Sequence, residues 1–373
     1  MPNLFRHLTD SCLAWLLPCI ILFNSFSQPI TRIVKKLILA ICLLSVTFAH
    51  AQNKAGRQQL ASIGDFKLES GKTILDCKIG YRAFGKLNAE KNNAVVFLTW
   101  FGGVSQNNEG GDTFKAIDTT RFCLIIIDAL GNGISSSPSN SVKQHGTSFP
   151  VFSIRDMVNS QHELLTKKFG ITHVRAVMGI SMGGIQTFQW AVSYPDFMDA
   201  LVPIVGSPQP TGFDMMLCTT FRRIIESDSD YNHGNYKVNP KITNANLLWE
   251  LFLTTPSEKA RSRPHDNFPD WLKGMDAQGH ADWNDTWYQI TAIIGHDITK
   301  PFNGSMQQAA AHVKAKMLII SSKQDHMVNP NPAVEFSKLL PAKLILIDSD
   351  AGHLAGNLGN TEARNAVIEL LAN

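Results

Sequence analysis

Short apolar runs alternate with helix-like segments through most of this 373-residue chain. The runs are rich in Val, Ile and Leu, as strands are when both faces of their sheet are covered. Between two of them, residues 153–169 place apolar side chains at helical spacing, and Gly170 stands where a helix would end. Alternation of this kind predicts a mostly parallel sheet flanked by helices. The expected strands are Ala94–Trp100, Phe122–Asp128, His173–Ile180, Ala200–Val205, Lys316–Ser321 and Lys343–Ile347.

Two segments depart from this alternation. Residues 65–84, with Gly71 at a turn, predict a hairpin that leads into the sheet. Residues 209–313 are polar and rich in Trp, Asp and Asn, and they contain helical pieces at 219–226 and 244–254 without a clear strand. We therefore expect residues 52–208 and 314–373 to form the core domain and residues 209–313 to form a helical cap or lid.

Residues 1–51 have the pattern of a targeting segment. Two lysines precede an apolar stretch at 37–48, and the small-residue triplet Ala49–Ala51 follows it. A charged region, an apolar region and a cleavage site in this order are typical of a secretory signal. We therefore expect an exported protein, periplasmic or secreted, that is cleaved before Gln52.

Two alternatives remain open for this leader. A second apolar run at 12–23 lies upstream, so an uncleaved leader would be a membrane anchor. Each run is shorter than the ~20 residues of a spanning helix, which favours the signal. The other alternative is a start of translation near Val34, because the upstream residues are additional to a complete signal.

The charge balance excludes one class of partner. The formal net charge of +3 comes from residues 1–51, where Arg6, Arg32 and two lysines outnumber Asp10. The remaining chain is neutral and has no run of Lys or Arg, so it lacks the electrostatic signature of a nucleic-acid-binding protein.

Three cysteines follow the leader: Cys77, Cys123 and Cys218. An odd number leaves at least one thiol unpaired within the chain. Cys123 lies in an apolar run and is expected to be a buried hydrophobic residue. An oxidising compartment would permit a Cys77–Cys218 disulfide, which nothing else in the sequence indicates.

The strongest local motif is Gly179–Gly184, with the sequence Gly-Ile-Ser-Met-Gly-Gly. By itself a G-x-S-x-G pattern could be only a glycine turn. Here an apolar strand precedes it and a helical segment, Gln186–Ser193, follows it, which is the setting of a nucleophile elbow. The motif predicts the α/β-hydrolase fold, with Ser181 exposed as a nucleophile at the end of its strand.

A serine nucleophile needs a base, and the base needs an acid that orients it. In this fold the order along the chain is Ser, then Asp or Glu, then His. Asp325 and His353 each follow a predicted strand, at the edge of the sheet that presents Ser181. We therefore predict a Ser181–His353–Asp325 triad. The competing residues are Asp348 and Asp350 for the acid and His326 for the base.

The developing oxyanion needs two donors. In this fold one is the amide after the nucleophile and the other comes from the loop after the third strand. These rules select the backbone of Met182 and, in the glycine-containing loop Thr99–Gly103, that of Phe101.

A set of further segments runs through both the core and the expected cap. Those in the core are Asp128–Gly133, Ser135–Pro138, Ser153–Val158, Gln161, Gly179–Gln186, Trp190–Ala191 and Tyr194–Asp196. Those in the cap are Phe221–Ile225, Asp228, Gly234, Tyr236, Asp282–Asp285 and Tyr288–Gln289. In these segments the chain resembles the homoserine O-acetyltransferases, and the likeness covers most of its length after about residue 64. The elbow alone would not separate this family from other α/β-hydrolases, and the cap motifs make the resemblance specific.

The resemblance implies a ping-pong mechanism in which Ser181 is acylated and then gives the acyl group to an alcohol in a deep tunnel. It implies that Arg222 binds the carboxylate of an amino-acid acceptor, with Arg223 as the competitor, and that Tyr236 belongs to the substrate site. The chain departs from the family at His280–Asn284, where the family has Arg-Phe-Asp-Ala-Asn and this sequence lacks the basic residue.

Three functions follow from these observations. The first is an exported hydrolase of a small acyl ester, and the second is an O-acyltransferase that moves an acetyl group from acetyl-CoA to homoserine or a similar alcohol. The third is an inactive binding module, which should have lost a triad residue. No metal or cofactor is expected, and acetyl-CoA would enter only as a cosubstrate. The sequence leaves a homodimer open.

Overall fold

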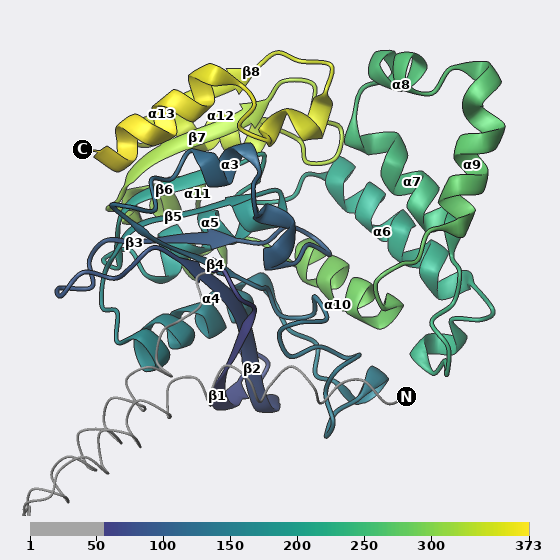
Figure 1. Ribbon diagram of the computed structural model, residues 1–373, viewed down its shortest axis with the longest axis horizontal. Helices are drawn as coiled ribbons and strands as arrows, with labels where there is room; N and C mark the ends of the chain where they lie inside the picture. Colours follow the sequence, from purple (N-terminus) through teal and green to yellow (C-terminus); the bar gives the residue numbers. More distant parts are fainter. Residues whose placement is uncertain (1–55, 373) are drawn as a thin grey trace, which may run out of the picture. The chain divides into compact units, whose positions relative to one another are not determined.

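The computed structural model describes residues 56–372, so the predicted leader lies outside the described residues. One sheet organises the described chain, with the strand order β1-β2-β4-β3-β5-β6-β7-β8 (Figure 1). No described helix is long and apolar enough to span a membrane. The strands are β1 (Gln59–Lys67), β2 (Thr73–Phe84), β3 (Ala94–Leu98), β4 (Cys123–Ile127), β5 (Val174–Ile180), β6 (Met198–Ile204), β7 (Lys316–Ser322) and β8 (Ala342–Ile347).

The predicted sheet and hairpin are confirmed. β1 and β2 pair antiparallel around Gly71, whose φ of 81° suits the turn, and β2 pairs antiparallel with β4. From β4 to β8 every neighbouring pair is parallel. The parallel strands therefore present their carboxyl ends along one edge, which brings the loops after β3, β5, β7 and β8 together.

Helices cover both faces of the sheet. α4, α5, α11 and α12 pack on one face, and α3 and α13 pack on the other. The α-helices are α3 (Asp112–Lys115), α4 (Ile154–Glu163), α5 (Met182–Ser193), α6 (Gly212–Ser227), α7 (Thr243–Leu253), α8 (Pro256–Ser262), α9 (Phe268–Ala277), α10 (Trp283–Ile294), α11 (Met306–His312), α12 (Asn331–Ser337) and α13 (Thr361–Ala372).

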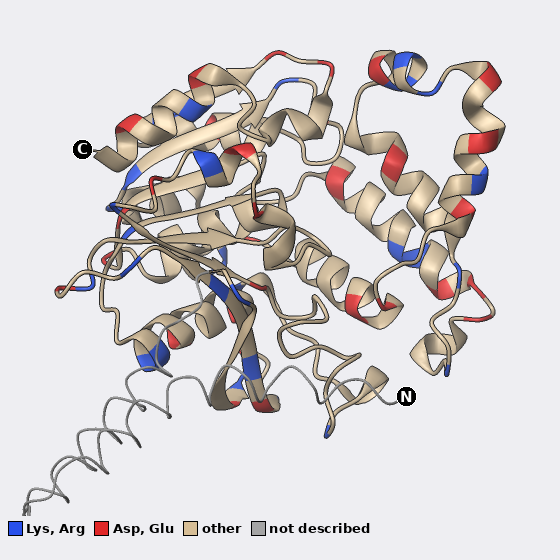
Figure 2. Ribbon diagram, in the orientation of Figure 1, with Lys and Arg blue, Asp and Glu red and all other residues tan. Residues whose placement is uncertain are grey.

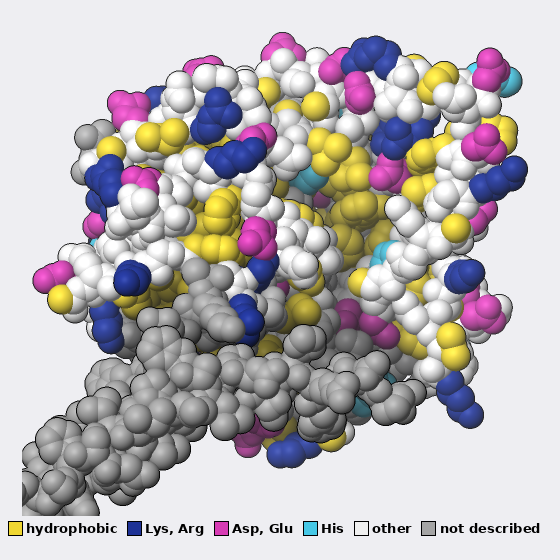
Figure 3. Space-filling view, in the orientation of Figure 1, with side chains coloured by type: hydrophobic (Ala, Val, Ile, Leu, Met, Phe, Trp, Pro, Cys, Tyr) yellow, Lys and Arg dark blue, Asp and Glu magenta, His cyan; other side chains and the backbone are white. Residues whose placement is uncertain are grey.

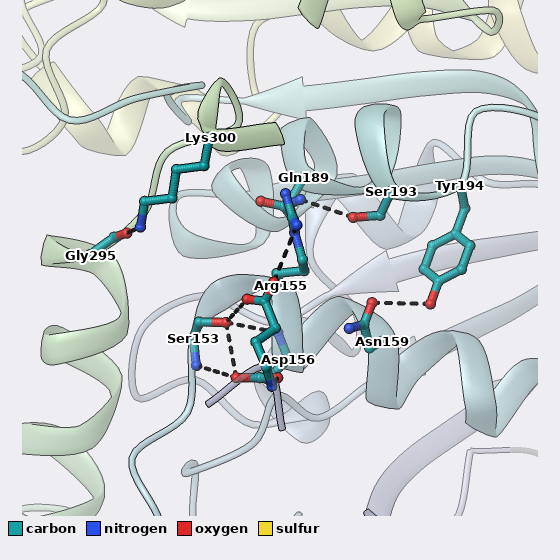
Figure 4. A network of polar contacts seen from close by, with 10 residues as sticks. Ser153, Arg155, Asp156, Asn159, Gln189, Ser193, Tyr194, Gly295 and Lys300 are labelled. Carbon is teal, nitrogen blue, oxygen red and sulfur yellow. Dashed lines mark hydrogen bonds and ion pairs between the residues drawn. The ribbon is translucent and has the colours of Figure 1, made fainter. Parts of the chain in front are cut away.

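Capping hydrogen bonds define the start of α4, which packs beside α5, the helix that follows Ser181 (Figure 4). At the start of α4, Ser153 Oγ accepts a hydrogen bond from the amide of Asp156, and a carboxylate oxygen of Asp156 accepts one from the amide of Ser153. The helix continues as a π-helical segment, Leu164–Phe169, and ends at Gly170 with a φ of 62°. The hydroxyl of Tyr194, after α5, lies 3.0 Å from Asn159 of α4. The capping contacts thus define where this helix begins and ends, and the hydrogen bond between Tyr194 and Asn159 joins it to the end of α5.

The segment between β6 and β7 contains helices and no strand. α6 packs on α7 and α10, and α7 packs on α9. In Figure 1 α7, α8 and α9 stand to one side of the sheet. The last helix of this segment, α11, instead contacts α5 on the core. The cap in this structure therefore ends before α11, somewhat earlier than the expected boundary at residue 313.

Cys77, Cys123 and Cys218 are free and buried. The permitted Cys77–Cys218 disulfide is therefore absent from this structure. Burial raises the pKa of the Cys77 and Cys218 thiols to about 12 and that of Cys123 to about 11, so all three are protonated hydrophobic residues of the interior. Lys and Arg alternate with Asp and Glu along the ribbon, in keeping with the neutral charge balance of the body (Figure 2).

Candidate active site

Ser181 lies between β5 and α5 in a strained backbone conformation, with φ 58° and ψ −120°. Its amide donates to the carbonyl of Ile204 on the neighbouring strand β6, which anchors the turn at 2.9 Å. The glycines of the motif permit this turn. A Cβ on Gly179 would lie 2.5 Å from the backbone of Gly183, so any larger residue would push strand and helix apart.

The structure brings the three predicted side chains together. His353 Nε2 lies 2.8 Å from Ser181 Oγ, and His353 Nδ1 lies 2.7 Å from a carboxylate oxygen of Asp325. The other oxygen of Asp325 accepts the amides of Met327 and Val328, at 2.8 and 2.9 Å. The carboxylate therefore accepts the Nδ1 proton of the imidazole, which leaves the Nε2 lone pair to accept the serine hydroxyl.

The competing residues point elsewhere. Asp350 forms an ion pair with Arg261, and Asp348 binds Lys323 and Gln324. His326 is exposed. None of the three makes a hydrogen bond with Ser181 or His353 within the described residues, whereas Asp325 and His353 do form a hydrogen-bonded chain with Ser181.

The two predicted oxyanion donors lie beside the serine. The amide of Met182 is the first in α5 and has no acceptor in its own helix, and Phe101 lies on the loop after β3. Within residues 56–372 neither amide donates a hydrogen bond to another protein atom. The amide of Gly102 donates to the side chain of Gln289 at 2.8 Å, which ties this loop to α10. Phe101, Met182 and Ser181 line the same cavity, so both amides belong to the candidate site.

Ser181 opens onto two cavities of different size and character. The smaller one has a volume of about 30 Å³ and lies between the elbow and the cap. The larger one is an open cleft of about 560 Å³ that also reaches His353, and Figure 3 shows a hollow with hydrophobic side chains between core and cap. Small-cavity residues besides Ser181 are Phe101, Met182, Ile185, Ser207, Pro210, Asp214, Cys218, Trp249, Ile293, His296, Met327 and Val328.

The structure does not bring Arg222 and Tyr236 to either cavity that contains Ser181. Cys218 of α6 lines the small cavity, and Arg222 lies one helical turn further along. There its Nε is 3.4 Å from Glu226 and its guanidinium is 5.8 Å from the centre of the Trp287 ring. Arg223 is exposed. The packing of α6 on α10 thus directs the expected carboxylate clamp away from the serine.

Tyr236 belongs to a separate polar pocket of about 250 Å³. Its hydroxyl donates to Asp282 at 2.7 Å and accepts the amide of Asn284 at 2.9 Å. Burial raises the pKa of Tyr236, so the phenol stays protonated. In this structure Tyr236 supports the start of α10 rather than a group near Ser181.

Several cavity residues escaped the sequence analysis. Ser207 lies three residues after the end of β6, so its place near the carboxyl edge of the sheet was a usable signal. No signal in the sequence pointed to His296 or Trp249, because their approach to Ser181 depends on how the cap folds over the core. Within the described residues no group of His, Cys, Asp and Glu side chains could hold a metal ion.

Comparison with known proteins agrees with this geometry. The alpha/beta hydrolase fold family matches residues 93–356. The chain belongs to this family. It is 30% identical to a probable esterase of Corynebacterium glutamicum over 80% of this chain and 90% of that protein. It is 32% identical to a homoserine O-acetyltransferase of Methanococcoides burtonii over 72% of this chain and 62% of that one.

Among solved structures, an acetylester hydrolase from Corynebacterium glutamicum superposes with a TM-score of 0.77 at 27% identity, over 85% of this chain and 96% of that one. The resemblance to homoserine O-acetyltransferases is confirmed, and esterases share it. The protein is therefore an enzyme of serine-type acyl transfer or hydrolysis. The alternative of an inactive binding module loses its support.

Proposed function

We propose that this enzyme is an exported ester hydrolase for short acyl groups, with Ser181 as nucleophile, His353 as general base and acid, and Asp325 as the residue that orients the imidazole. The observation that carries this proposal is the continuous hydrogen-bonded chain from Ser181 Oγ through His353 to Asp325, beside the two free amides.

In the proposed mechanism Ser181 Oγ attacks the ester carbonyl carbon while His353 Nε2 takes its proton. The amides of Met182 and Phe101 bind the oxyanion of the tetrahedral intermediate. The intermediate collapses, the bond to the alcohol oxygen breaks, and His353 returns the proton to the leaving alcohol. Water then attacks the acyl-serine with His353 again as base, and the acid is released as Ser181 regains its proton.

Two features favour water as the acceptor. The large cleft reaches both Ser181 and His353 and is open, so water has access to the acyl-enzyme. None of the residues that line the two cavities is Lys or Arg. A free amino acid carries a carboxylate and acetyl-CoA carries phosphates, and both would need such a cation nearby.

The small cavity favours a short acyl group. About 30 Å³ is enough for roughly two water-sized groups, since one needs ~10–15 Å³. The name of the acetylester hydrolase with a similar structure agrees with a short acyl chain. The alcohol part of the ester would occupy the larger cleft.

An O-acyltransferase is the second candidate, favoured by the cap motifs and by the homoserine O-acetyltransferase relatives. The test uses protein without residues 1–51 and a short-chain activated ester, with and without acetyl-CoA and homoserine. Steady hydrolysis that homoserine leaves unchanged is the expected result. Acceleration by homoserine, with O-acetylhomoserine as the product, would replace hydrolysis with transfer.

Export is a separate part of the proposal and rests on the charged, apolar and small-residue pattern before Gln52. Mass spectrometry of the protein from its native host should find a mature chain that begins at Gln52. A cytoplasmic chain that retains residues 37–48 would contradict export, and a membrane-bound one would establish the anchor.

A further inference from the structure

His296 is a buried polar side chain without an ordinary hydrogen bond, and it is one of the residues that line the small cavity beside Ser181. His296 comes directly after Gly295, the residue that ends α10, and only 4% of its surface is exposed. Neither ring nitrogen has a partner of standard hydrogen-bond geometry. Buried polar groups in native proteins are nearly always paired, so an unpaired one at a reactive serine calls for a ligand.

Two other polar side chains of the cavity, those of Ser207 and Asp214, already have partners. Ser207 Oγ donates to the carbonyl of Gln209 at 2.6 Å. One carboxylate oxygen of Asp214 accepts the amide and hydroxyl of Thr211, and the other accepts the amide of Asn329 at 2.8 Å. The Ser207 backbone lies near enough to His296 to favour its protonated form, but not in ordinary hydrogen-bond geometry. Among the residues that line this cavity, only His296 has buried side-chain nitrogen or oxygen atoms without an ordinary hydrogen-bond partner.

The charge state of His296 limits what it can bind. Burial lowers its pKa to about 3, so the ring is neutral in ordinary buffers and offers one N–H donor and one acceptor nitrogen. The carboxylate of Asp214 lines the same cavity and no Lys or Arg does. A negatively charged group is disfavoured there, and a neutral group that both donates and accepts, such as a hydroxyl, fits.

The size of the cavity limits the reach of such a group. With the carbonyl oxygen at the amides of Met182 and Phe101, the acyl chain beyond the carbonyl extends into about 30 Å³. This space takes about two heavy atoms. A CH₂–OH group has this size, and its hydroxyl would reach the wall that His296 forms.

We propose that His296 is a specificity-determining residue that binds a hydroxyl on the acyl chain, so that the preferred substrates are esters of short, neutral hydroxy acids. This inference rests on the proposed ester hydrolysis. An alkyl chain of equal length would leave the imidazole unpaired and displace any water that solvates it, whereas a hydroxyl replaces those hydrogen bonds.

Ethyl glycolate and ethyl propionate test the proposal, because their acyl chains have nearly the same shape. Glycolate carries a hydroxyl group where propionate carries a methyl group. Each kcat/KM is divided by the hydroxide-catalysed rate of the same ester, which removes the difference in intrinsic reactivity. The wild-type enzyme should prefer glycolate by at least about tenfold. His296→Phe should abolish the preference, and His296→Asn, which keeps a donor and an acceptor, should retain part of it.

His162→Phe is the matched control, because His162 is a half-buried histidine stacked on Tyr194, far from the cavity lining. It should leave the ratio of the two esters unchanged. Equal corrected rates in the wild type, or a glycolate preference that persists in His296→Phe, would overturn the inference. Should His296→Phe fail to fold, the ratio of the corrected kcat/KM values of the two esters in the wild type still tests the inference. Failure of the proposed function gives a different result, namely no hydrolysis of either ester.

Discussion

His353 Nε2 lies 2.8 Å from Ser181 Oγ although 172 residues separate them along the chain. Ser181 follows β5 and His353 follows β8, and the strands between these two are β6 and β7. Parallel pairing aligns the carboxyl ends of all four strands, so the contact is set by the sheet rather than by a movable loop alone. A site mounted on rigid elements in this way is preorganised for proton transfer.

Ser181→Ala should remove activity without unfolding the enzyme. The change deletes one oxygen and keeps the strained backbone, so we expect turnover to fall by roughly three to six orders of magnitude with an unchanged melting temperature. Ester hydrolysis and thermal unfolding measure the two effects. Near-full activity would refute the assignment of Ser181.

Ser181→Gly separates the strain from the chemistry. It should be equally inactive but more stable than Ser181→Ala by about 1 kcal/mol, because glycine adopts the φ of 58° without steric cost. Denaturant unfolding of the two variants checks this difference. Equal stability would mean that the elbow stores little strain.

Asp325→Asn should lower turnover by about four orders of magnitude. The amide oxygen would keep the hydrogen bonds from Met327 and Val328, so the NH2 group would donate to His353 Nδ1 and the imidazole would lose its required tautomer. Asp350→Asn is the matched control, since Asp350 follows the neighbouring strand and binds Arg261 instead of His353. We expect Asp350→Asn to retain turnover within about tenfold. The reverse pattern would make Asp350 the acid.

The sequence predicted the core of this protein well, because strong local signals coincide with the elements that form it. The apolar runs from Ala94 to Ile347 became strands with ends shifted by at most two residues, as at Trp100 and Met198. Chain order and strand ends were enough to bring Ser181, Asp325 and His353 together, since parallel strands share an edge.

The cap was harder to predict because its side-chain directions depend on tertiary packing. The expected helical piece 219–226 lies within α6, and Glu226 is an i,i+4 partner of Arg222. No local pattern, however, connects Arg222 with Trp287 of α10, whose packing helps decide whether Arg222 faces Ser181. The same reason hid His296, whose burial requires α10 to lie against the elbow. Sequence patterns thus found two helices of the cap, α6 and α7, but not the faces they present.

Arg222→Ala tests what the acyl group is transferred to. Arg222 is engaged by Glu226 and Trp287 and does not line the cavities at Ser181, so ester hydrolysis should stay within about tenfold of wild type. Arg223→Ala, at the exposed neighbour, is the control. Burst-phase acylation and steady-state turnover are measured with homoserine titrated in. A homoserine-dependent acceleration that Arg222→Ala abolishes would restore the transferase, since losing a buried carboxylate contact costs about 2–5 kcal/mol.

Asp285 should make the enzyme less stable as pH rises. This carboxyl lies in the first turn of α10, where it accepts hydrogen bonds from the amide and hydroxyl of Ser139 at 2.9 and 2.6 Å. Burial raises its pKa to about 7, which outweighs the opposing effect of the Ser139 contacts, and the nearby Asp282 raises it further. In the unfolded chain the same group titrates near ~3.9.

The sign of the effect follows from proton binding. Below pH ~4 both states hold the proton, so the contribution of the protonated carboxyl to stability is complete there. Between pH ~4 and about 7 only the folded state keeps the proton, and the free energy of unfolding therefore falls as pH rises.

Asp285→Asn tests this pH dependence, because its side chain cannot ionise and its amide can still pair with Ser139. From pH 5 to pH 8 its stability relative to wild type should rise by roughly 1–3 kcal/mol, as measured by urea unfolding. Asp118→Asn is the control, because the exposed Asp118 has its pKa lowered, chiefly by hydrogen bonding to the Thr120 side chain, and its replacement should show no such gain at high pH. An Asp285→Asn effect of the same size at both pH values would mean that Asp285 is already ionised in the folded enzyme at pH 5.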